Sequence, residues 1–154
     1  RSRKMSECIF CRIIKGEIPC TKIYEDEEFL AILDINPNSE GMTLVLTKKH
    51  YPSYVFDMPD EVYKKFMLVS KKIAKTIDKA LNVKRTAMVM EGMGINHAHI
   101  KLYPLHGLKE TFTEMWHPEK VFFKKYEGYI TTQLGPEAKK EELEKTAKKI
   151  KSLL

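Results

Sequence analysis

The sequence has no hydrophobic run that approaches the length of a membrane-spanning helix, and its N-terminus lacks the hydrophobic region of a secretory signal peptide. We therefore expect a cytoplasmic protein without a membrane partner. Cysteine is scarce too: the chain has three, an odd number that argues against a closed disulfide framework. In a reducing compartment, a closely spaced cysteine pair is usually a metal or redox device.

Most of the chain is only mildly basic. The formal net charge is +6, of which +3 comes from Arg1, Arg3 and Lys4. This balance suits a small molecule that carries phosphate, and it gives little reason to expect a nucleic-acid partner. The length of 154 residues, with 43% hydrophobic and 31% charged residues, fits one globular domain with a real core. We expect residues 1–6 to be a flexible N-terminal arm or a tag remnant.

Hydrophobic periodicity predicts an α+β fold. Apolar side chains recur every third or fourth position from Val62 to Ala80, which indicates one long helix with Asp57 as its N-cap. A short helix is expected near residues 8–16, and the charged segment 137–154 predicts a C-terminal helix. Short apolar runs predict strands at residues 22–25, 29–35, 42–46, 86–90 and 97–103.

Polar and apolar residues alternate strictly in the stretch from Asn96 to Pro104. Because successive side chains of a strand point to opposite faces, this alternation places His97, His99 and Lys101 on one face. Two imidazoles and a fixed positive charge in a row suit an anion such as phosphate, a metal ion, or both.

A cysteine pair near the N-terminus raises the possibility of a zinc site. Tetrahedral zinc commonly takes two thiolates from a C-x-x-C unit, here Cys8 and Cys11, and two imidazoles. The candidate imidazoles are those of His50, His97 and His99. If His50 and one strand histidine bind the metal, the other strand histidine stays free; if both strand histidines bind, His50 is the spare. Spacing alone leaves these alternatives open.

The same strand face could serve phosphate chemistry. A neutral imidazole is a competent nucleophile toward phosphorus, and Lys101 is a suitable donor to the oxygens of the transition state. The loop before the strand holds Gly92, Gly94 and Asn96. Glycine would let backbone N–H groups approach phosphate oxygens closely, although two glycines before a strand are also an ordinary turn.

These motifs resemble the histidine triad (HIT) family, whose signature alternates three histidines with apolar residues. The resemblance covers about residues 7–105 and runs through several motifs in order: Cys8-Ile9-Phe10-Cys11, Gly16-Glu17-Ile18-Pro19, Leu33-Asp34-Ile35-Asn36-Pro37, Lys48-Lys49-His50 and His97-Ala98-His99. It implies a five-stranded antiparallel sheet with one long and one short helix, followed by a C-terminal extension over residues 106–154 within the same globular unit. It also implies a homodimer that binds nucleotides.

Site roles follow from the resemblance by position. His99 matches the nucleophile that attacks the α-phosphate, beside Lys101. Residues of the nucleotide pocket match Ile9, Phe10, Ile13, Leu33, Asp34 and Ile35, with Asp34 on the ribose hydroxyls. In the zinc-bearing members the ligand set matches Cys8, Cys11, His50 and His97, and leaves His99 free; the zinc there is structural.

The chain departs from the family pattern in three places, one of which is the loop from Gly92 to His97, which is shorter than usual and lacks the familiar Gln. Lys101 stands where the third histidine belongs, and Met90 replaces an asparagine ahead of the loop glycine. A lysine keeps a phosphate donor but is a poor proton shuttle at neutral pH. We expect a hydrolase or nucleotidyl transferase that acts at the α-phosphate of a nucleoside phosphate derivative, such as a dinucleoside polyphosphate or phosphoramidate, through a nucleotidyl-histidine intermediate. The alternatives are a nucleotide-binding module with impaired catalysis and, third, a zinc-stabilised nucleic-acid-binding domain.

Overall fold

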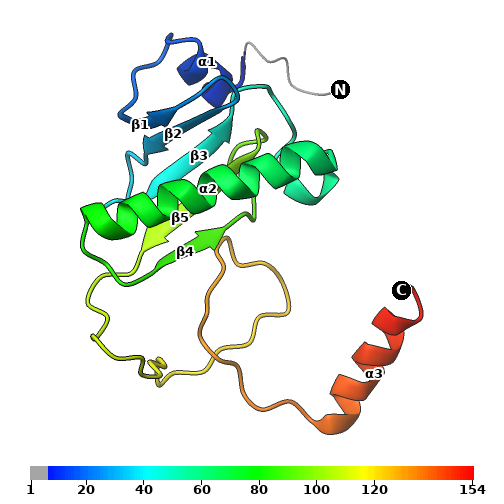
Figure 1. Cartoon of the computed structure of the whole chain (residues 1–154). Helices are drawn as coiled ribbons and strands as arrows, with labels where there is room; N and C mark the ends of the chain where they lie inside the picture. Colours follow the sequence, from blue (N-terminus) through cyan, green and yellow to red (C-terminus); the bar gives the residue numbers. More distant parts are fainter. Residues whose placement is uncertain (1–6) are drawn as a thin grey trace. The chain divides into compact units, whose positions relative to one another are not determined.

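The computed structural model describes residues 7–154, so the predicted N-terminal arm lies outside the described residues. These residues divide into two units, one that ends at Thr111 and one that spans Phe112–Leu154. Figure 1 shows the chain coloured along its sequence. Within the described part of the chain, no helix has the length and apolar character needed to cross a membrane.

The first unit is built on a five-stranded antiparallel sheet with the order β1-β2-β3-β5-β4. This confirms the predicted fold class. The elements are α1 (Ile9–Ile14), β1 (Lys22–Glu25), β2 (Phe29–Leu33), β3 (Thr43–Thr47), the 3-10 helix η2 (Val55–Asp57), α2 (Asp60–Ala80), β4 (Thr86–Val89) and β5 (His99–Pro104).

Each face of the sheet buries a separate apolar cluster. The long helix α2 lies across one face (Figure 1). On that face Phe66 stacks on Phe29 of β2 with ring centroids 5.6 Å apart. The short helix α1 covers the other face, where Phe10 packs with Leu30 and Ile32. Because β2 is covered on both faces, its sequence is a continuous apolar run instead of an alternating one.

The start of α2 differs from the prediction. The sequence predicts Asp57 as the N-cap, but Asp57 ends η2 and the N-cap position is held by Pro59, without a side-chain hydrogen bond. Proline lacks an N–H and fixes its own φ, so it stops η2 from continuing and starts α2 afresh. Asp60 and Glu61 lie in the first turn, where negative charge suits the helix dipole.

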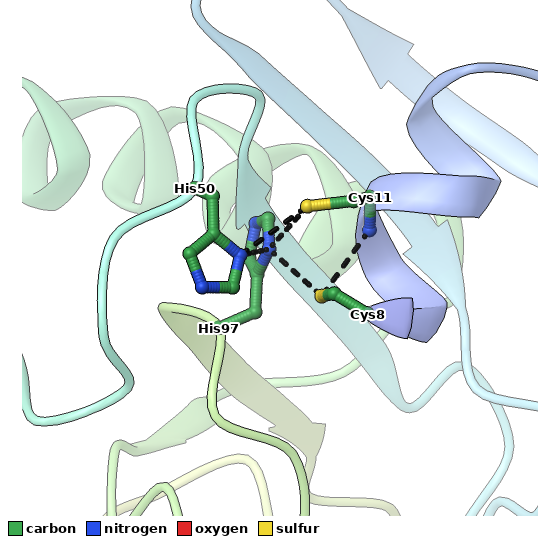
Figure 2. A group of neighbouring side chains, drawn as sticks. All are labelled: Cys8, Cys11, His50 and His97. Carbon is green, nitrogen blue, oxygen red and sulfur yellow. Dashed lines mark hydrogen bonds between the residues drawn. The ribbon is translucent and has the colours of Figure 1, made fainter. Parts of the chain in front are cut away.

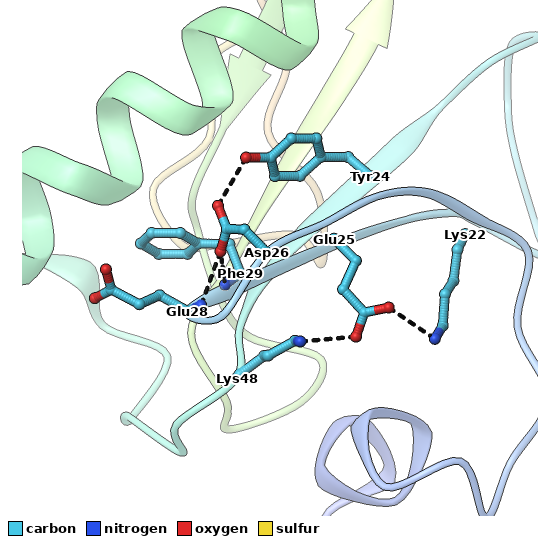
Figure 3. Close-up of polar contacts among 7 residues, drawn as sticks. All are labelled: Lys22, Tyr24, Glu25, Asp26, Glu28, Phe29 and Lys48. Carbon is cyan, nitrogen blue, oxygen red and sulfur yellow. Dashed lines mark hydrogen bonds and ion pairs between the residues drawn. The ribbon is translucent and has the colours of Figure 1, made fainter.

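The turn between β1 and β2 is organised by Asp26 (Figure 3). Its Oδ1 accepts hydrogen bonds from the backbone N–H groups of Glu28 and Phe29, at 2.8 and 2.7 Å, and its Oδ2 accepts the Tyr24 hydroxyl at 2.7 Å. Beside the turn, the Glu25 carboxylate bridges Lys22 and Lys48 at 2.9 and 2.7 Å. The acidic run at 25–28 is therefore an ordered turn.

The second unit contains α3 (Lys140–Lys151), which confirms the predicted C-terminal helix with shorter bounds. No side chain of Phe112–Leu154 is buried, and large apolar residues such as Phe112 and Phe122 are exposed. That residues 106–154 form an extension of one globular unit stays a prediction.

Candidate functional site

Four side chains from three parts of the chain meet at the end of α1 (Figure 2). Cys8 is the N-cap of α1 and Cys11 lies in its first turn, His50 comes from the segment after β3, and His97 comes from the segment before β5. Their ligand atoms all lie within 4.8 Å of one another. The Cys11 sulfur is 3.2 Å from His50 Nδ1 and 3.5 Å from His97 Nδ1, and the Cys8 sulfur is 3.4 Å from His97 Nδ1. The two Nδ1 atoms are 3.1 Å apart.

These separations fit a tetrahedral metal site. With Zn–S near 2.3 Å and Zn–N near 2.05 Å, a regular tetrahedron sets S–N pairs about 3.5 Å apart and N–N pairs about 3.3 Å apart. The observed values lie within a few tenths of an ångström of both. Two soft sulfurs with two imidazoles are a donor set typical of structural zinc, with no position left open for a substrate. The residues present therefore fit a closed metal centre.

The His97 ring is oriented for metal binding by the backbone. Its Nε2–H donates to the carbonyl oxygen of Thr47 at 2.7 Å, which leaves the lone pair of Nδ1 directed at the sulfurs. The side chain is fully buried, and burial lowers the pKa of His97 to about 4. The imidazole is therefore neutral at pH 7, as a metal ligand must be.

The local fold of α1 places the two sulfurs together. Cys8 is the N-cap of the helix, and its sulfur accepts a hydrogen bond from the backbone N–H of Cys11 at 3.4 Å. Burial and the adjacent Cys8 raise the pKa of the Cys11 thiol to about 11. A cation between the sulfurs would reverse that preference and release the proton on binding.

His99 lies two residues further along the same face and uses its nitrogens in the opposite way. Its Nδ1–H donates to the carbonyl oxygen of His97 at 2.6 Å, so the lone pair is on Nε2. The ring is 4% exposed and meets Phe10 edge-on, with centroids 5.2 Å apart. Burial lowers the pKa of His99, so the ring is neutral at pH 7. His99 is therefore a neutral, oriented imidazole outside the metal-ligand group.

Three charged groups act electrostatically on His99: Lys101, Glu91 and Asp34. Lys101 and Glu91 form an ion pair with Nζ 3.7 Å from Oε1. Asp34 follows β2, and its Oδ1 accepts the N–H of Asn36 at 2.7 Å, which leaves a second carboxylate oxygen for another partner.

The loop before β5 borders a cavity of 540 Å³. The cavity is lined by residues at the N-terminal end of α1, by Ser53 and by the loop: Cys8, Ile9, Ser53, Gly92, Met93, Gly94, Ile95 and Asn96. Ser53 fixes the loop, because its hydroxyl donates to the Gly92 carbonyl at 2.7 Å and its N–H donates to Asn96 Oδ1 at 2.9 Å. The predicted loop residues Gly92, Gly94 and Asn96 therefore share one concave surface.

A family model described as the HIT domain matches residues 15–107. The chain belongs to the HIT family. It is 42% identical over 101 residues to an uncharacterized HIT-like protein of Methanocaldococcus jannaschii (63% of this chain, 78% of that protein). It is 39% identical over 107 residues to the adenylylsulfatase HINT3 of Arabidopsis thaliana (67% and 54%). It is 34% identical over 119 residues to the adenosine 5'-monophosphoramidase HNT1 of Saccharomyces cerevisiae (77% and 75%).

Solved structures of the family agree with the fold. The structure of SMU.412c from Streptococcus mutans UA159 has a TM-score of 0.70 and 28% identity, with 97% of this chain and 86% of that chain covered. A Zn-bound histidine triad family protein from Mycobacterium smegmatis has a TM-score of 0.62 and 31% identity, with 75% and 86% covered. The grouping of Cys8, Cys11, His50 and His97 is consistent with the zinc-binding branch of the HIT family.

The predicted apolar pocket residues of the HIT domain are dispersed. Phe10 is buried, and Ile13 packs against the apolar cluster to which Phe10 belongs. Ile9 and Ile35 are exposed, and the exposed fraction of Ile35 is 89%. Leu33 is not brought together with Phe10, because it lines a cavity with Ile73 and Ile77 of α2 on the other face of the sheet.

The strand neighbour of Leu33, Ile32, lies on the face of the sheet that packs against Phe10. It is buried in the same cluster as Phe10, and the pocket prediction omitted it. Side chains of a strand alternate between the two faces of the sheet, so Ile32 shares its face with Asp34, two residues further on. Because Asp34 acts electrostatically on His99, this alternation would have indicated Ile32 as the residue on the His99 face. The continuous apolar run of β2 hid that alternation.

Proposed function

We propose that this HIT protein is a nucleotide hydrolase that acts at the α-phosphate of a nucleoside phosphate derivative through a covalent intermediate on His99. Nucleotidyl transfer to an acceptor other than water belongs to the same chemistry. The observation that carries the proposal is the orientation of His99. Its Nδ1–H is committed to the His97 carbonyl at 2.6 Å, so a buried and neutral ring offers Nε2 as nucleophile. The relatives named as adenylylsulfatase and monophosphoramidase support this reaction class.

The first step forms a bond between His99 Nε2 and the α-phosphorus. The bond from phosphorus to the leaving group breaks, and its electron pair departs with that group. The ring then carries a positive charge, which the His97 carbonyl oxygen stabilises through the Nδ1–H bond. In the second step water attacks phosphorus, the phosphorus–nitrogen bond breaks, and its electron pair returns to Nε2. The products are a nucleoside monophosphate and a proton, and His99 is neutral again.

Charge on the phosphate oxygens is stabilised by groups around the ring. The Lys101 ammonium lies on the same face of β5 as His99 and acts on it electrostatically. Backbone N–H groups of the loop at Gly92, Gly94 and Asn96 suit the remaining oxygens. Asp34 is proposed to hold the ribose hydroxyls, with Phe10 and Ile32 on the base and Ile9, Ile13 and Ile35 at its edge.

We propose zinc as the resident metal, held by Cys8, Cys11, His50 and His97 in a structural role. Its ligands tie α1 to the segments that flank β3 and β5, so the metal fixes the position of Phe10 against His99. Zinc would supply no step of the reaction, because all four ligand positions are filled by the protein. A homodimer and a cytoplasmic location remain part of the proposal, and free cysteines fit a reducing compartment.

The proposal is tested with a panel of nucleoside phosphoramidates, dinucleoside polyphosphates, adenylyl sulfate and nucleotide sugars, assayed on metal-replete protein. Release of nucleoside monophosphate from at least one class is expected, and His99→Asn should abolish it. A protein that binds nucleoside monophosphate but turns over no member of the panel would instead be the catalytically impaired binding module.

A further inference from the structure

The ion pair between Lys101 and Glu91 joins β5, the strand that begins with His99, to the loop that follows β4. Val89 of β4 pairs with Lys101 of β5, so the residues that follow β4 lie beside the lysine. The Lys101 and Glu91 side chains are only 29% and 16% exposed. A charge pair this sheltered is screened less by salt than a pair on the open surface.

Glu91 also ties the lysine to the loop. While Oε1 pairs with Lys101, Oε2 accepts the backbone N–H of Met93 at 3.2 Å. Met93 lies between the two loop glycines, and Ser53 holds the carbonyl of the first of them, Gly92, at 2.7 Å. One carboxylate therefore joins the ammonium group and the loop that would receive the phosphate.

A lysine ammonium held by a carboxylate is a fixed positive charge. It can stabilise negative charge on phosphate oxygens or on a departing group, but it has no readily transferred proton at neutral pH. The other charged groups that act on His99 are Asp34 and Glu91, and both are carboxylates that accept hydrogen bonds. His50 and His97 belong to the metal-ligand group. Among the charged groups that act on His99 and the histidines of the metal-ligand group, none is therefore suited to give a leaving group its proton.

This absence matters differently for different leaving groups. When an anhydride is cleaved, the electron pair leaves on a phosphate or sulfate oxygen, which is stable as an anion. When a phosphoramidate or an alkyl ester is cleaved, the pair falls on an amine nitrogen or an alkoxide oxygen, which must gain a proton to depart. General acid catalysis of that proton transfer typically contributes about 10²–10⁴-fold in rate.

We propose that the Glu91–Lys101 pair makes this enzyme selective for nucleotide anhydrides, whose leaving group departs as a phosphate- or sulfate-type anion, over phosphoramidates and alkyl esters. Glu91 acts as a positioning residue for Lys101 in this selection. The inference rests on the proposed function and names its substrate class. The nucleoside part is not involved, so the selection is by the leaving group alone.

The test is a series of adenosine 5'-phosphate derivatives that differ only in leaving group: sulfate, phosphate, an alkyl alcohol and a primary amine. The constant kcat/KM is measured for each, because it reports the steps up to departure of the leaving group. The wild type should cleave the two anhydrides at least about 10²-fold faster than the amine and the alcohol derivatives.

Two variants separate the roles of the pair. Lys101→His introduces a group that can donate a proton, so kcat/KM for the amine derivative should rise relative to the sulfate derivative by about 10-fold or more. Glu91→Gln should lower kcat on the anhydrides with a smaller change in KM, because the lysine stays but is no longer held. Glu28→Gln, which removes the exposed Lys65–Glu28 ion pair, is the matched control and should leave both constants unchanged.

Equal kcat/KM for anhydride and amine derivatives in the wild type would overturn the inference while leaving the proposed function intact. An unchanged preference in Lys101→His would also overturn it. If neither anhydrides nor phosphoramidates are cleaved by the metal-replete wild type, the proposed function fails and the inference fails with it.

Discussion

His97 and His99 lie two residues apart on one sheet face, yet their rings are anchored through opposite nitrogens. His97 donates from Nε2 to Thr47 at 2.7 Å, and His99 donates from Nδ1 to the carbonyl oxygen of His97 at 2.6 Å. The first ring is left with a lone pair on Nδ1, facing two sulfurs, and the second with a lone pair on Nε2. These backbone contacts thus distinguish the proposed metal ligand from the proposed nucleophile, and the two roles should be separable by mutation.

The variant His99→Asn should lose turnover by at least about 10³-fold and keep full zinc stoichiometry, because His99 lies outside the ligand group. His97→Asn should lose the metal. The measurement is elemental analysis of the purified variants together with nucleoside monophosphate release. Loss of zinc in His99→Asn would contradict the assignment of the two rings.

Removing one metal ligand should destabilise the first unit. We expect Cys11→Ser to lose zinc and to lower the free energy of unfolding by about 3–5 kcal/mol, as loss of a structural metal does. Cys20→Ser is the matched control, since Cys20 lies outside the ligand group and should change stability by no more than about 1 kcal/mol. Denaturant unfolding with and without a chelator measures both; equal stability of the two variants would contradict a structural metal.

Gly92 is required by backbone conformation and by space. Its φ is +69°, and a Cβ there would lie 2.9 Å from the carbonyl oxygen of Ser53. Gly92→Ala should therefore cost about 1–2 kcal/mol of stability and weaken nucleotide binding. At Gly94 a Cβ would meet nothing within 4 Å, so Gly94→Ala should cost about 0.5 kcal/mol or less. Similar losses from both substitutions, measured by urea unfolding, would contradict this reading of the loop.

Asp26→Ala should lower stability at pH 7 by about 1–3 kcal/mol, because it leaves the Tyr24 hydroxyl and two backbone N–H groups without their acceptor. Burial alone would raise the pKa of Asp26, but these hydrogen bonds outweigh it and hold the pKa below the ordinary 3.8. The contribution is therefore complete above about pH 4 and is lost as the pH falls through the folded-state pKa.

Unfolding curves between pH 7 and pH 3 check this pH dependence. The difference between wild type and Asp26→Ala should be constant down to about pH 4 and should shrink in more acid solution. Glu27→Ala, at an exposed neighbouring position, is the control and should show no such difference. A difference that grows toward acid pH would contradict the predicted sign.

Much of this architecture could be predicted because local patterns of polar and apolar residues determine it. The strict alternation around His97 and His99 fixes a strand face, and the spacing from Val62 to Ala80 fixes α2. The proposed metal ligands were predicted only with the help of the family resemblance, since spacing left His50, His97 and His99 as competing ligands. The rings of His97 and His99 are distinguished by their backbone contacts, and the partner of His97, Thr47, lies 50 residues away in the sequence.

Other features depend on contacts between residues that are distant in the sequence, and the sequence alone did not predict them. Glu91 gives no signal of its own, and its partnership with Lys101 exists only because β4 pairs with β5. Ile32 and Leu33 are both apolar in a strand covered on both faces, so composition could not tell which one joins Phe10. The prediction of Asp57 as the N-cap is wrong because Asp57 ends η2, and Met58 and Pro59 separate it from the first residue of α2.

The most direct test of the account is to trap the protein with a cleavable nucleotide anhydride, quench at neutral pH with denaturant, and map the modified residue by mass spectrometry. The account predicts one nucleotidyl group on His99 in the wild type and none in His99→Asn. A turnover-competent protein that carries no adduct, or one that carries it on a different residue, would contradict the account.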